Sequence, residues 1–150
     1  MGRQHLHRPV IAPADRSDAA TVVALWERCG LTRPWNDPHA DFERALAGAT
    51  STVLLTRNDD VVIGSVMVGH DGHRGWLYYL AVAPGRRGQG IGRALFAAAE
   101  NWLRTAGVPK VQLMVRSGNR DALAFYHSIG LARQDVVVFG RFLNADGPGQ

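Results

Sequence analysis

The sequence is poor in cysteine and has no long hydrophobic run. Cys29 is the one cysteine among 150 residues, so an internal disulfide bond is excluded and a reducing compartment is favoured. No apolar run approaches the roughly 18 residues of a membrane span, so we expect no membrane partner. The opening stretch MGRQHLHRPV lacks the apolar core of a secretion signal. We therefore expect a cytoplasmic protein.

The composition is that of a globular domain with an excess of basic side chains. Hydrophobic residues make up 46% of the chain and charged residues 20%, which predicts one folded domain over residues 1–150. We expect residues 1–8 to be a flexible extension and 144–150 a flexible tail. The net charge of +4 and the isoelectric point near 10.0 favour an anionic partner. Nucleic acid, a phosphorylated cofactor and an acidic protein surface all fit that charge.

The order of predicted elements is that of a mixed α/β (α+β) fold. After a short edge strand at PVIA, Asp15 or Ser17 caps a helix with its apolar face at Ala19, Val22, Val23 and Trp26. Asp37 and Pro38 open a second helix, which ends at Gly48. The later segments predict a hairpin (51–57 and 61–69), a third strand (76–82), a further strand (110–116) and one or two closing strands (131–143). Two helices alternate with these strands. A long helix from Ile91 has Leu95, Ala98 and Trp102 inward, and a helix from Asn119 has Ala122, Phe125, Tyr126 and Ile129 inward. We therefore predict a central mixed sheet flanked by about four helices.

The stretch APGRRGQGIGRAL, residues 83–95, places three glycines at alternate positions before the long helix. Each glycine costs about 0.5–1 kcal/mol relative to alanine inside an element, so the pattern needs a reason. A helix N-terminus offers unpaired backbone N–H groups to an anion, and glycine lets a phosphate approach them closely. Arg86, Arg87 and Arg93 add positive charge. The stretch predicts a site for a phosphorylated ligand.

Two common phosphate-binding motifs do not fit this stretch. A P-loop requires Gly-Lys-Ser/Thr, whereas Gly92 is followed by Arg93 and Ala94. A dinucleotide-binding GxGxxG fails because its third glycine would fall on Arg93 or Leu95. The pattern that fits is Arg-x-x-Gly-x-Gly, formed by Arg87, Gly90 and Gly92.

With these residues the sequence resembles the GNAT superfamily of N-acetyltransferases. The similarity rests on LAVAPGRRGQGIGRAL together with NRDALAFYHSIGL, and it extends over nearly the whole chain. LWERCGLTRPWNDP and DGHRG are similar to one bacterial subgroup, the YpeA-like acetyltransferases. The resemblance implies a GNAT-like fold, acetyl-CoA as co-substrate, and direct acetyl transfer to a primary amine of a small molecule or protein in a ternary complex.

The resemblance also implies roles for particular residues. The backbone of Leu80, Ala81 and Val82 would hold the pantetheine arm, and the N–H of Leu80 would stabilise the developing oxyanion. Asn119 would contact the pantetheine, and Tyr126 would protonate the departing thiolate. The pyrophosphate would be held by Arg87 and by the turn formed by Gly88, Gln89, Gly90, Ile91, Gly92 and Arg93. The acceptor would be bound by the loop residues Trp35, Asn36 and Asp37 and by Tyr78.

Several points stay open in the sequence. Asn119 is also a natural helix cap, and Tyr126 lies on an apolar helix face where tyrosine can be a core residue. Relatives carry a catalytic glutamate at positions that are Trp76 or Met114 here, so the general base is water, Asp37, Asp71, His73 or Tyr78.

Other interpretations compete with the enzymatic one. We expect Cys29 to be a buried structural thiol, and the histidines of HDGH to form a turn rather than a metal site. A basic nucleic-acid-binding domain would explain the charge, and a non-catalytic CoA-binding regulator would explain the glycine motif. We do not expect nucleic acid as the partner, because the arginines gather around the glycine stretch. Both a monomer and a homodimer are compatible with the sequence.

Overall fold

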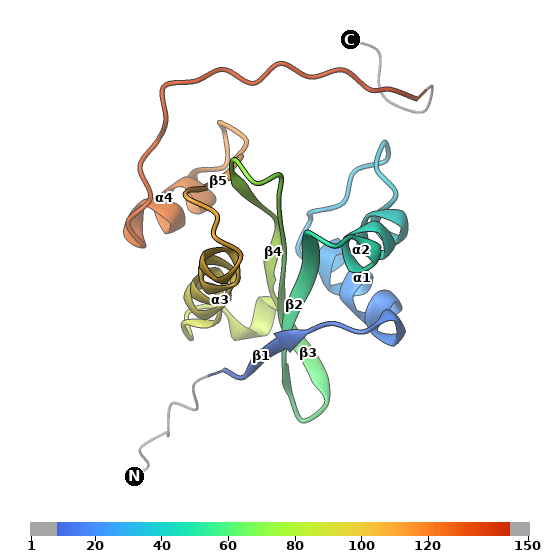
Figure 1. Cartoon of the computed structure of the whole chain (residues 1–150). Helices are drawn as coiled ribbons and strands as arrows, with labels where there is room; N and C mark the ends of the chain where they lie inside the picture. Colours follow the sequence, from blue (N-terminus) through green and yellow to red (C-terminus); the bar gives the residue numbers. More distant parts are fainter. Residues whose placement is uncertain (1–8, 145–150) are drawn as a thin grey trace.

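The protein, seen in a computed structural model that describes residues 9–144, is built on one mixed five-stranded sheet (Figure 1). The segments expected to be flexible, 1–8 and 144–150, lie outside this range except for Asn144. The strand order is β1-β2-β3-β4-β5, antiparallel throughout except that β4 and β5 are parallel. The strands are β1 (Ile11–Pro13), β2 (Ser51–Asn58), β3 (Val61–His70), β4 (Gly75–Val82) and β5 (Val111–Leu113).

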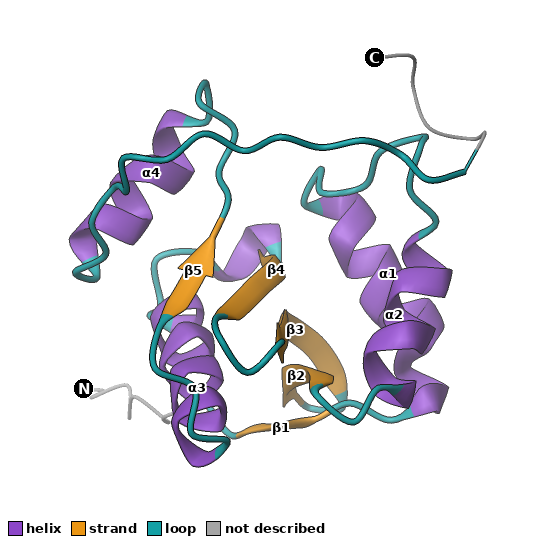
Figure 2. Ribbon diagram, turned by 45° about the horizontal axis from the view of Figure 1, so that its top comes forward, coloured by secondary structure: helices purple, strands orange, loops and turns teal. Residues whose placement is uncertain are grey.

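Four helices cover the two faces of the sheet, as predicted (Figure 2). Helices α1 (Ala19–Arg28) and α2 (Pro38–Ala47) pack on one face, around Trp26 and Phe42. Helices α3 (Ile91–Thr105) and α4 (Arg120–Ser128) lie on the other face. The face of α3 is rotated slightly from the prediction, because its buried positions are Ile91, Leu95, Phe96, Ala99 and Leu103 while Ala98 and Trp102 are half-buried. Along residues 9–144 the chain has no helix that is both long and apolar enough to cross a membrane.

Side-chain caps begin α2 and α4 where the sequence predicts them. Asp37 accepts a hydrogen bond from the backbone N–H of Ala40 (3.1 Å) with Pro38 in the first turn, and Asn119 does the same for Ala122 (3.1 Å). Asp15 caps the short 3₁₀ helix η1 (Arg16–Asp18) that precedes α1, rather than α1 itself.

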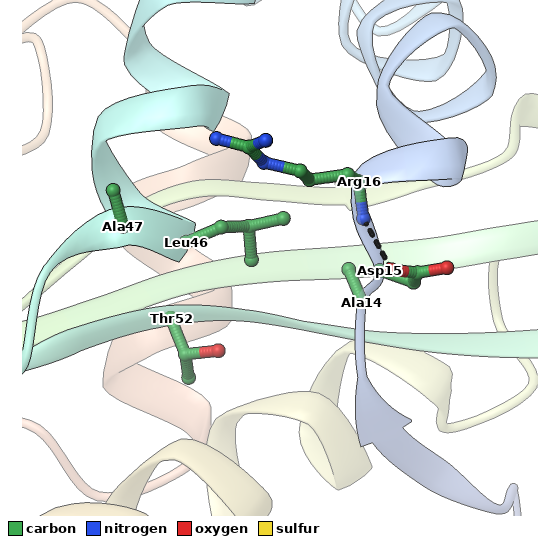
Figure 3. A pocket seen from close by; sticks show the side chains of 6 residues that line it. All are labelled: Ala14, Asp15, Arg16, Leu46, Ala47 and Thr52. Atoms are coloured by element: carbon green, nitrogen blue, oxygen red, sulfur yellow. Dashed lines mark hydrogen bonds between the residues drawn. The ribbon is translucent and has the colours of Figure 1, made fainter.

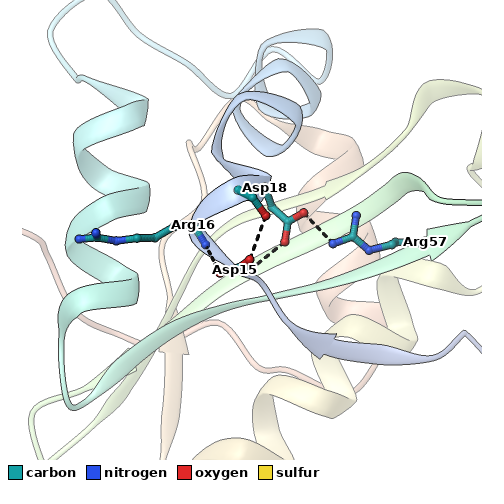
Figure 4. A network of polar contacts seen from close by, with 5 residues as sticks. Asp15, Arg16, Asp18 and Arg57 are labelled. Atoms are coloured by element: carbon teal, nitrogen blue, oxygen red, sulfur yellow. Dashed lines mark hydrogen bonds and ion pairs between the residues drawn. The ribbon is translucent and has the colours of Figure 1, made fainter.

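Asp18 completes this first cap and ties it to the sheet (Figure 4). Its carboxylate accepts from the backbone N–H of Asp15 (2.8 Å) and from the Arg57 guanidinium on β2 (2.6 Å). Burial on its own would raise the pKa of Asp18, but these hydrogen bonds and the Arg57 charge hold it below the usual value.

The expectation of one or two closing strands is wrong for the described part of the chain. Residues 131–144 form no strand, and from Ala132 to Leu143 no backbone N–H or C=O group bonds to another described backbone group. Figure 1 shows the segment, in orange and red, leaving α4 and crossing the molecule clear of the sheet. A strand needs a neighbouring edge, and here the valine-rich sequence does not meet one among residues 9–144.

Candidate active site

Strands β4 and β5 pair at one end only and then diverge. Gly75, Trp76 and Leu77 pair with Val111, Gln112 and Leu113, whereas β4 continues to Val82. From Tyr78 to Val82, β4 therefore has no partner strand on this side among the described residues. The backbone N–H and C=O groups that point to this side are available to an extended ligand, except that the Val82 carbonyl accepts a hydrogen bond from the Cys29 thiol (3.3 Å). The three residues expected to hold pantetheine, Leu80, Ala81 and Val82, all lie on this stretch.

A β-bulge interrupts β4 at this stretch. Tyr78 pairs with Met67 and Ala81 with Ser65, so Tyr79 and Leu80 together face Val66. Tyr79 has a φ of +55°, in the left-handed region that non-glycine residues rarely adopt. The bulge breaks the alternation of side chains along β4. Tyr79 packs with the core cluster beneath α1 and α2, whereas Leu77 and Leu80 pack with the core cluster beneath α3. The direction of the Leu80 backbone N–H therefore depends on the bulge.

Contacts from three elements hold Tyr79 in this conformation. Its ring stacks on Trp26, with centroids 3.8 Å apart and planes 7° apart. Its hydroxyl donates to the Asp41 carboxylate of α2 (2.6 Å), and the Trp26 indole N–H donates to Ser65 on β3 (2.9 Å). Burial and the Asp41 carboxylate raise the pKa of Tyr79, so the hydroxyl stays protonated. A strained residue persists when its surroundings fix it in this way.

The sequence alone did not predict a role for Tyr79 or Asp41. The run WLYYLAV is compatible with a regular strand and contains no signal for a bulge. Asp41 lies in the first turn of α2, where an acidic residue is already explained by the helix dipole. Their contact becomes visible only in the three-dimensional structure.

The predicted glycine turn lies directly between β4 and α3. Residues Pro84–Arg86 form a 3₁₀ turn, and Gly90 is the N-cap of α3 with a φ of +81° and no side-chain cap. Gly88 also has a positive φ, +80°. A Cβ added at Gly88 or Gly90 would meet no atom within 4 Å, so the backbone there faces open space. This geometry fits close approach of an anion to the N–H groups of the first turn of α3.

Gly92 is constrained for a different reason. A Cβ at Gly92 would lie 3.3 Å from the ring of Phe125 on α4 and 3.6 Å from Val82 on β4. Gly92 therefore allows α4 and β4 to approach the start of α3 closely. This packing brings the glycine turn, the end of β4 and the aromatic pair of α4 into one region.

Tyr126 lies in this region on α4. Its ring makes an edge contact with Phe125 (centroids 5.1 Å apart) and a tilted contact with Phe96 of α3 (6.3 Å). Burial raises the pKa of Tyr126 to about 12. Its hydroxyl has no hydrogen-bond partner among residues 9–144. A protonated and unengaged hydroxyl can donate a proton to a ligand group.

The residues expected on the acceptor side lie on the α1–α2 loop and on β4. Asn36 closes a turn through its N–H to the carbonyl of Arg33 (3.0 Å), and Trp35 beside it is half-buried. Tyr78 on β4 is 45% exposed, and burial of the rest raises its pKa. The bond from Tyr79 to Asp41 joins β4 to α2, whose start carries Asp37.

Two of the proposed bases are committed to local structure. Asp71 accepts hydrogen bonds from the N–H groups of Arg74 (2.8 Å) and His73 (2.9 Å), which lower its pKa and close the β3–β4 turn. Asp37 is the cap of α2. His73 and Tyr78 are exposed side chains without a partner of this kind among the described residues. Among residues 9–144, no three histidine, cysteine, aspartate or glutamate side chains come together as a possible metal site.

One further residue, Cys29, contacts this region, and one pocket lies apart from it. Cys29 is half-buried, and its thiol donates to the carbonyl of Val82 (3.3 Å), so it links the end of α1 to β4. A shallow pocket (Figure 3) opens between the start of η1 and the end of α2, lined by Ala14, Asp15, Arg16, Leu46, Ala47 and Thr52. None of these pocket residues belongs to the diverging strands or the glycine turn.

A mixed sheet that opens between β4 and β5, with a glycine turn leading into α3, defines the class of acyl-CoA-dependent acyltransferases that the sequence resembles. The model of the acetyltransferase (GNAT) family matches residues 20–131. The chain therefore belongs to the GNAT family of acetyltransferases.

Curated relatives and a solved structure agree with this assignment. Acetyltransferases of Yersinia enterocolitica and Pectobacterium atrosepticum are 41% and 42% identical to the chain over 131 residues, which is 87% of this chain and 93% of each relative. The aminoglycoside N-acetyltransferase AAC(6')-Iy, solved in complex with CoA, shares the fold with a TM-score of 0.77 at 19% identity, over 90% of this chain and 95% of that one.

Proposed function

We propose that the protein transfers an acetyl group from acetyl-CoA directly to a primary amine of a small molecule or protein, in a ternary complex. The observation that carries the proposal is the unpaired stretch of β4, Tyr78 to Val82, which leads straight into the open glycine turn. An extended pantetheine arm suits the former and a pyrophosphate suits the latter. The solved relatives AAC(6')-Iy with CoA and with a CoA-linked bisubstrate analogue support the choice of ligand.

In this proposal, acetyl-CoA supplies an activated thioester whose leaving thiolate is stable, since thiols have a pKa near 8.5. The backbone of Leu80 donates its N–H to the thioester oxygen as negative charge develops there. The hydroxyl of Tyr126 donates its proton to the sulfur as the carbon–sulfur bond breaks, and its phenolate regains the second proton that the attacking nitrogen loses. The backbone N–H groups of Gly88 to Arg93 and the Arg87 side chain bind the pyrophosphate, while Asn119 contacts the pantetheine.

The acceptor amine enters from the other side of β4. Trp35, Asn36 and Asp37 of the α1–α2 loop and Tyr78 orient it toward the thioester. The amine attacks after losing its proton to water or His73. Asp71 is held in its turn with a lowered pKa, and burial raises the pKa of Tyr78, so that its hydroxyl stays protonated and accepts no proton. Direct attack needs no acyl-enzyme, and the Cys29 thiol is engaged with a backbone carbonyl.

An acceptor screen tests the proposal. The protein is incubated with acetyl-CoA and, in turn, polyamines, aminoglycosides, lysine-containing peptides and peptides with a free N-terminus, and free thiol is measured. We expect amine-dependent thiol release for at least one class, matched by a 42 Da mass gain on that acceptor. Acetyl-CoA binding without transfer to any of these amines would instead support a non-catalytic CoA-binding regulator.

A further inference from the structure

Three large side chains beside the proposed acceptor site belong to neither core cluster. Trp76 and Tyr78 lie on β4, and Met114 directly follows β5. The core clusters beneath α1 and α2 and beneath α3 include none of the three. Trp76 is half-buried, whereas Tyr78 and Met114 are 45% and 51% exposed. Neighbouring large apolar side chains that fill no core and stay in contact with solvent are typical of a ligand-binding surface.

The alternation of side chains along β4 places two of them on one face of the sheet. A Cβ added at Gly75 would meet a side chain of α3, and Leu77 packs in the core cluster beneath α3. Trp76 and Tyr78 therefore point to the opposite face, which carries α1 and α2. Met67 of β3, the register partner of Tyr78, packs with the core cluster beneath those two helices.

The neighbouring strand β5 adds the third side chain to the same face. Val111 and Leu113 pack against the core cluster beneath α3, so alternation turns Gln112 and the following Met114 to the other face. Gln112 is the register partner of Trp76. Helices α1 and α2 contact β2, β3 and β4, and the cluster beneath them includes no residue of β5. Within residues 9–144, this corner of the sheet is therefore only partly covered, and we call Trp76, Tyr78 and Met114 the apolar strip.

The apolar strip lies beside the proposed reaction centre. Tyr78 is two residues from Leu80, whose N–H is the proposed oxyanion donor, so about 6 Å of strand separate them. An amine that attacks the thioester can therefore place a ring over Tyr78 through a short alkyl linker. Trp76 and Tyr78 are themselves about 7 Å apart along the strand. That length fits one ring better than it fits a stretch of peptide.

The charged groups near the α1–α2 loop do not suit an acceptor with several positive charges. Asp41 accepts a hydrogen bond from Tyr79 (2.6 Å) and pairs with Arg44 (2.7 Å). Asp37 caps α2. Arg33 adds positive charge to the loop, and its guanidinium donates to backbone carbonyls rather than to a carboxylate. A second ammonium group on the acceptor would therefore meet carboxylates that are already engaged.

We propose that the apolar strip selects, as acceptor, a small primary amine that carries an apolar ring. The proposal rests on the enzymatic function proposed above and names the kind of amine that the site takes. A ring buried against the strip gains the free energy of apolar burial, and an aromatic ring gains more from its contacts with Trp76 and Tyr78. The strip also acts on the reacting group, because an ammonium that is removed from water has a lower pKa and loses its proton more readily.

Steady-state kinetics with three amines at saturating acetyl-CoA test the proposal. The amines are 2-phenylethylamine, ethylamine, which lacks the ring, and 1,4-diaminobutane, which carries a second ammonium group instead. We expect kcat/KM for 2-phenylethylamine to exceed the other two values by about 10–100-fold, the gain from burying one ring. An equal or higher kcat/KM for ethylamine or 1,4-diaminobutane overturns the proposal.

Variants of the apolar strip test whether these side chains cause the preference. Trp76→Ala should lower the ratio of kcat/KM for 2-phenylethylamine to that for ethylamine about 10-fold, whereas Trp76→Phe keeps a ring and should retain most of it. Met114→Ala should lower the ratio about 3-fold, and it serves if Trp76→Ala fails to fold. Val61→Ala is the control, because Val61 is 57% exposed at the β2–β3 turn, away from the strip. An unchanged ratio in the folded strip variants overturns the proposal.

Calorimetry with the CoA-loaded protein separates this proposal from the enzymatic one. Tighter binding of 2-phenylethylamine than of ethylamine, lost in Trp76→Ala, supports the apolar strip even without transfer. Thiol release with none of these amines and none of those in the acceptor screen would contradict the enzymatic function. Equal binding of the two amines together with equal transfer would leave the enzymatic function standing and overturn the apolar strip.

Discussion

Among single residues, the Tyr126 hydroxyl combines a raised pKa of about 12 with no bond to another described residue. If it protonates the leaving thiolate, Tyr126→Phe should lower kcat by about 10²-fold, since positioned acids contribute 10²–10⁴ and thiolate leaves well unaided. The melting temperature should barely change, because no intramolecular hydrogen bond is lost. Turnover and thermal unfolding are measured on the same preparation. Full activity of this variant would show that the Tyr126 hydroxyl has no catalytic role and that its ring only packs against Phe96 and Phe125.

The same substitution at Tyr79 should have the opposite signature. Tyr79→Phe removes the hydroxyl that donates a hydrogen bond to the Asp41 carboxylate. The free energy of unfolding should therefore fall by about 1–2 kcal/mol. Release of the bulge should also shift the N–H of Leu80, and we expect kcat to fall about 10-fold with the KM for acetyl-CoA unchanged. Urea unfolding and steady-state kinetics measure the two effects. A stability loss with unchanged kcat would show that the contact has no positioning role.

Among secondary-structure elements, the join between η1 and β2 depends on the Asp18–Arg57 pair. The pKa of Asp18 is lowered in the folded state, so its contribution is present at neutral pH and is lost as pH falls below about 4 and through the folded-state pKa. Asp18→Asn should lower the free energy of unfolding by about 1–2 kcal/mol at pH 7. Near pH 2.5 the difference from the native protein should shrink.

Urea unfolding at both pH values measures this prediction. A difference of the same size at pH 2.5 would mean that the charge of Asp18 contributes nothing. Because Asp18 does not touch the bulge, kcat of Asp18→Asn should match that of the native protein, which makes it the stability control for Tyr79→Phe.

The elements that the sequence predicts well are those set by local chemistry. Asp37 with Pro38 marks the start of α2, and the glycine stretch 88–92 marks the turn into α3, because caps and positive φ angles depend on nearby residues alone. The β4 bulge at Tyr79 could not be predicted, because it depends on contacts with Trp26 and Asp41 that lie far away in sequence. Residues 131–143 have strand-like composition, but strand formation depends on an edge that composition does not identify.

At the scale of the whole molecule, the proposed catalytic site lies where β4 and β5 diverge. Most of the cofactor side of the proposed site comes from consecutive segments, β4, the glycine turn and α3, to which α4 adds Asn119 and Tyr126. The motif could therefore be identified in the sequence. The acceptor side is made by the α1–α2 loop and β4, which tertiary packing brings together through the bond between Tyr79 and Asp41. This difference explains why the sequence predicts the cofactor more sharply than the amine.

Thermal unfolding with and without acetyl-CoA, in Gly90→Val and in its matched control Gly72→Val, tests the proposed acetyl-CoA site directly. Both glycines have a positive φ, +81° and +87°, and a Cβ at either meets no atom within 4 Å, but Gly72 lies in the β3–β4 turn. Acetyl-CoA at a hundred-fold excess over Kd should raise the melting temperature of the native protein and of Gly72→Val by about 5–10 °C. Gly90→Val should show no rise, because its side chain occupies the path of the pyrophosphate. A full rise in Gly90→Val, or none in the native protein, would contradict the proposed acetyl-CoA site.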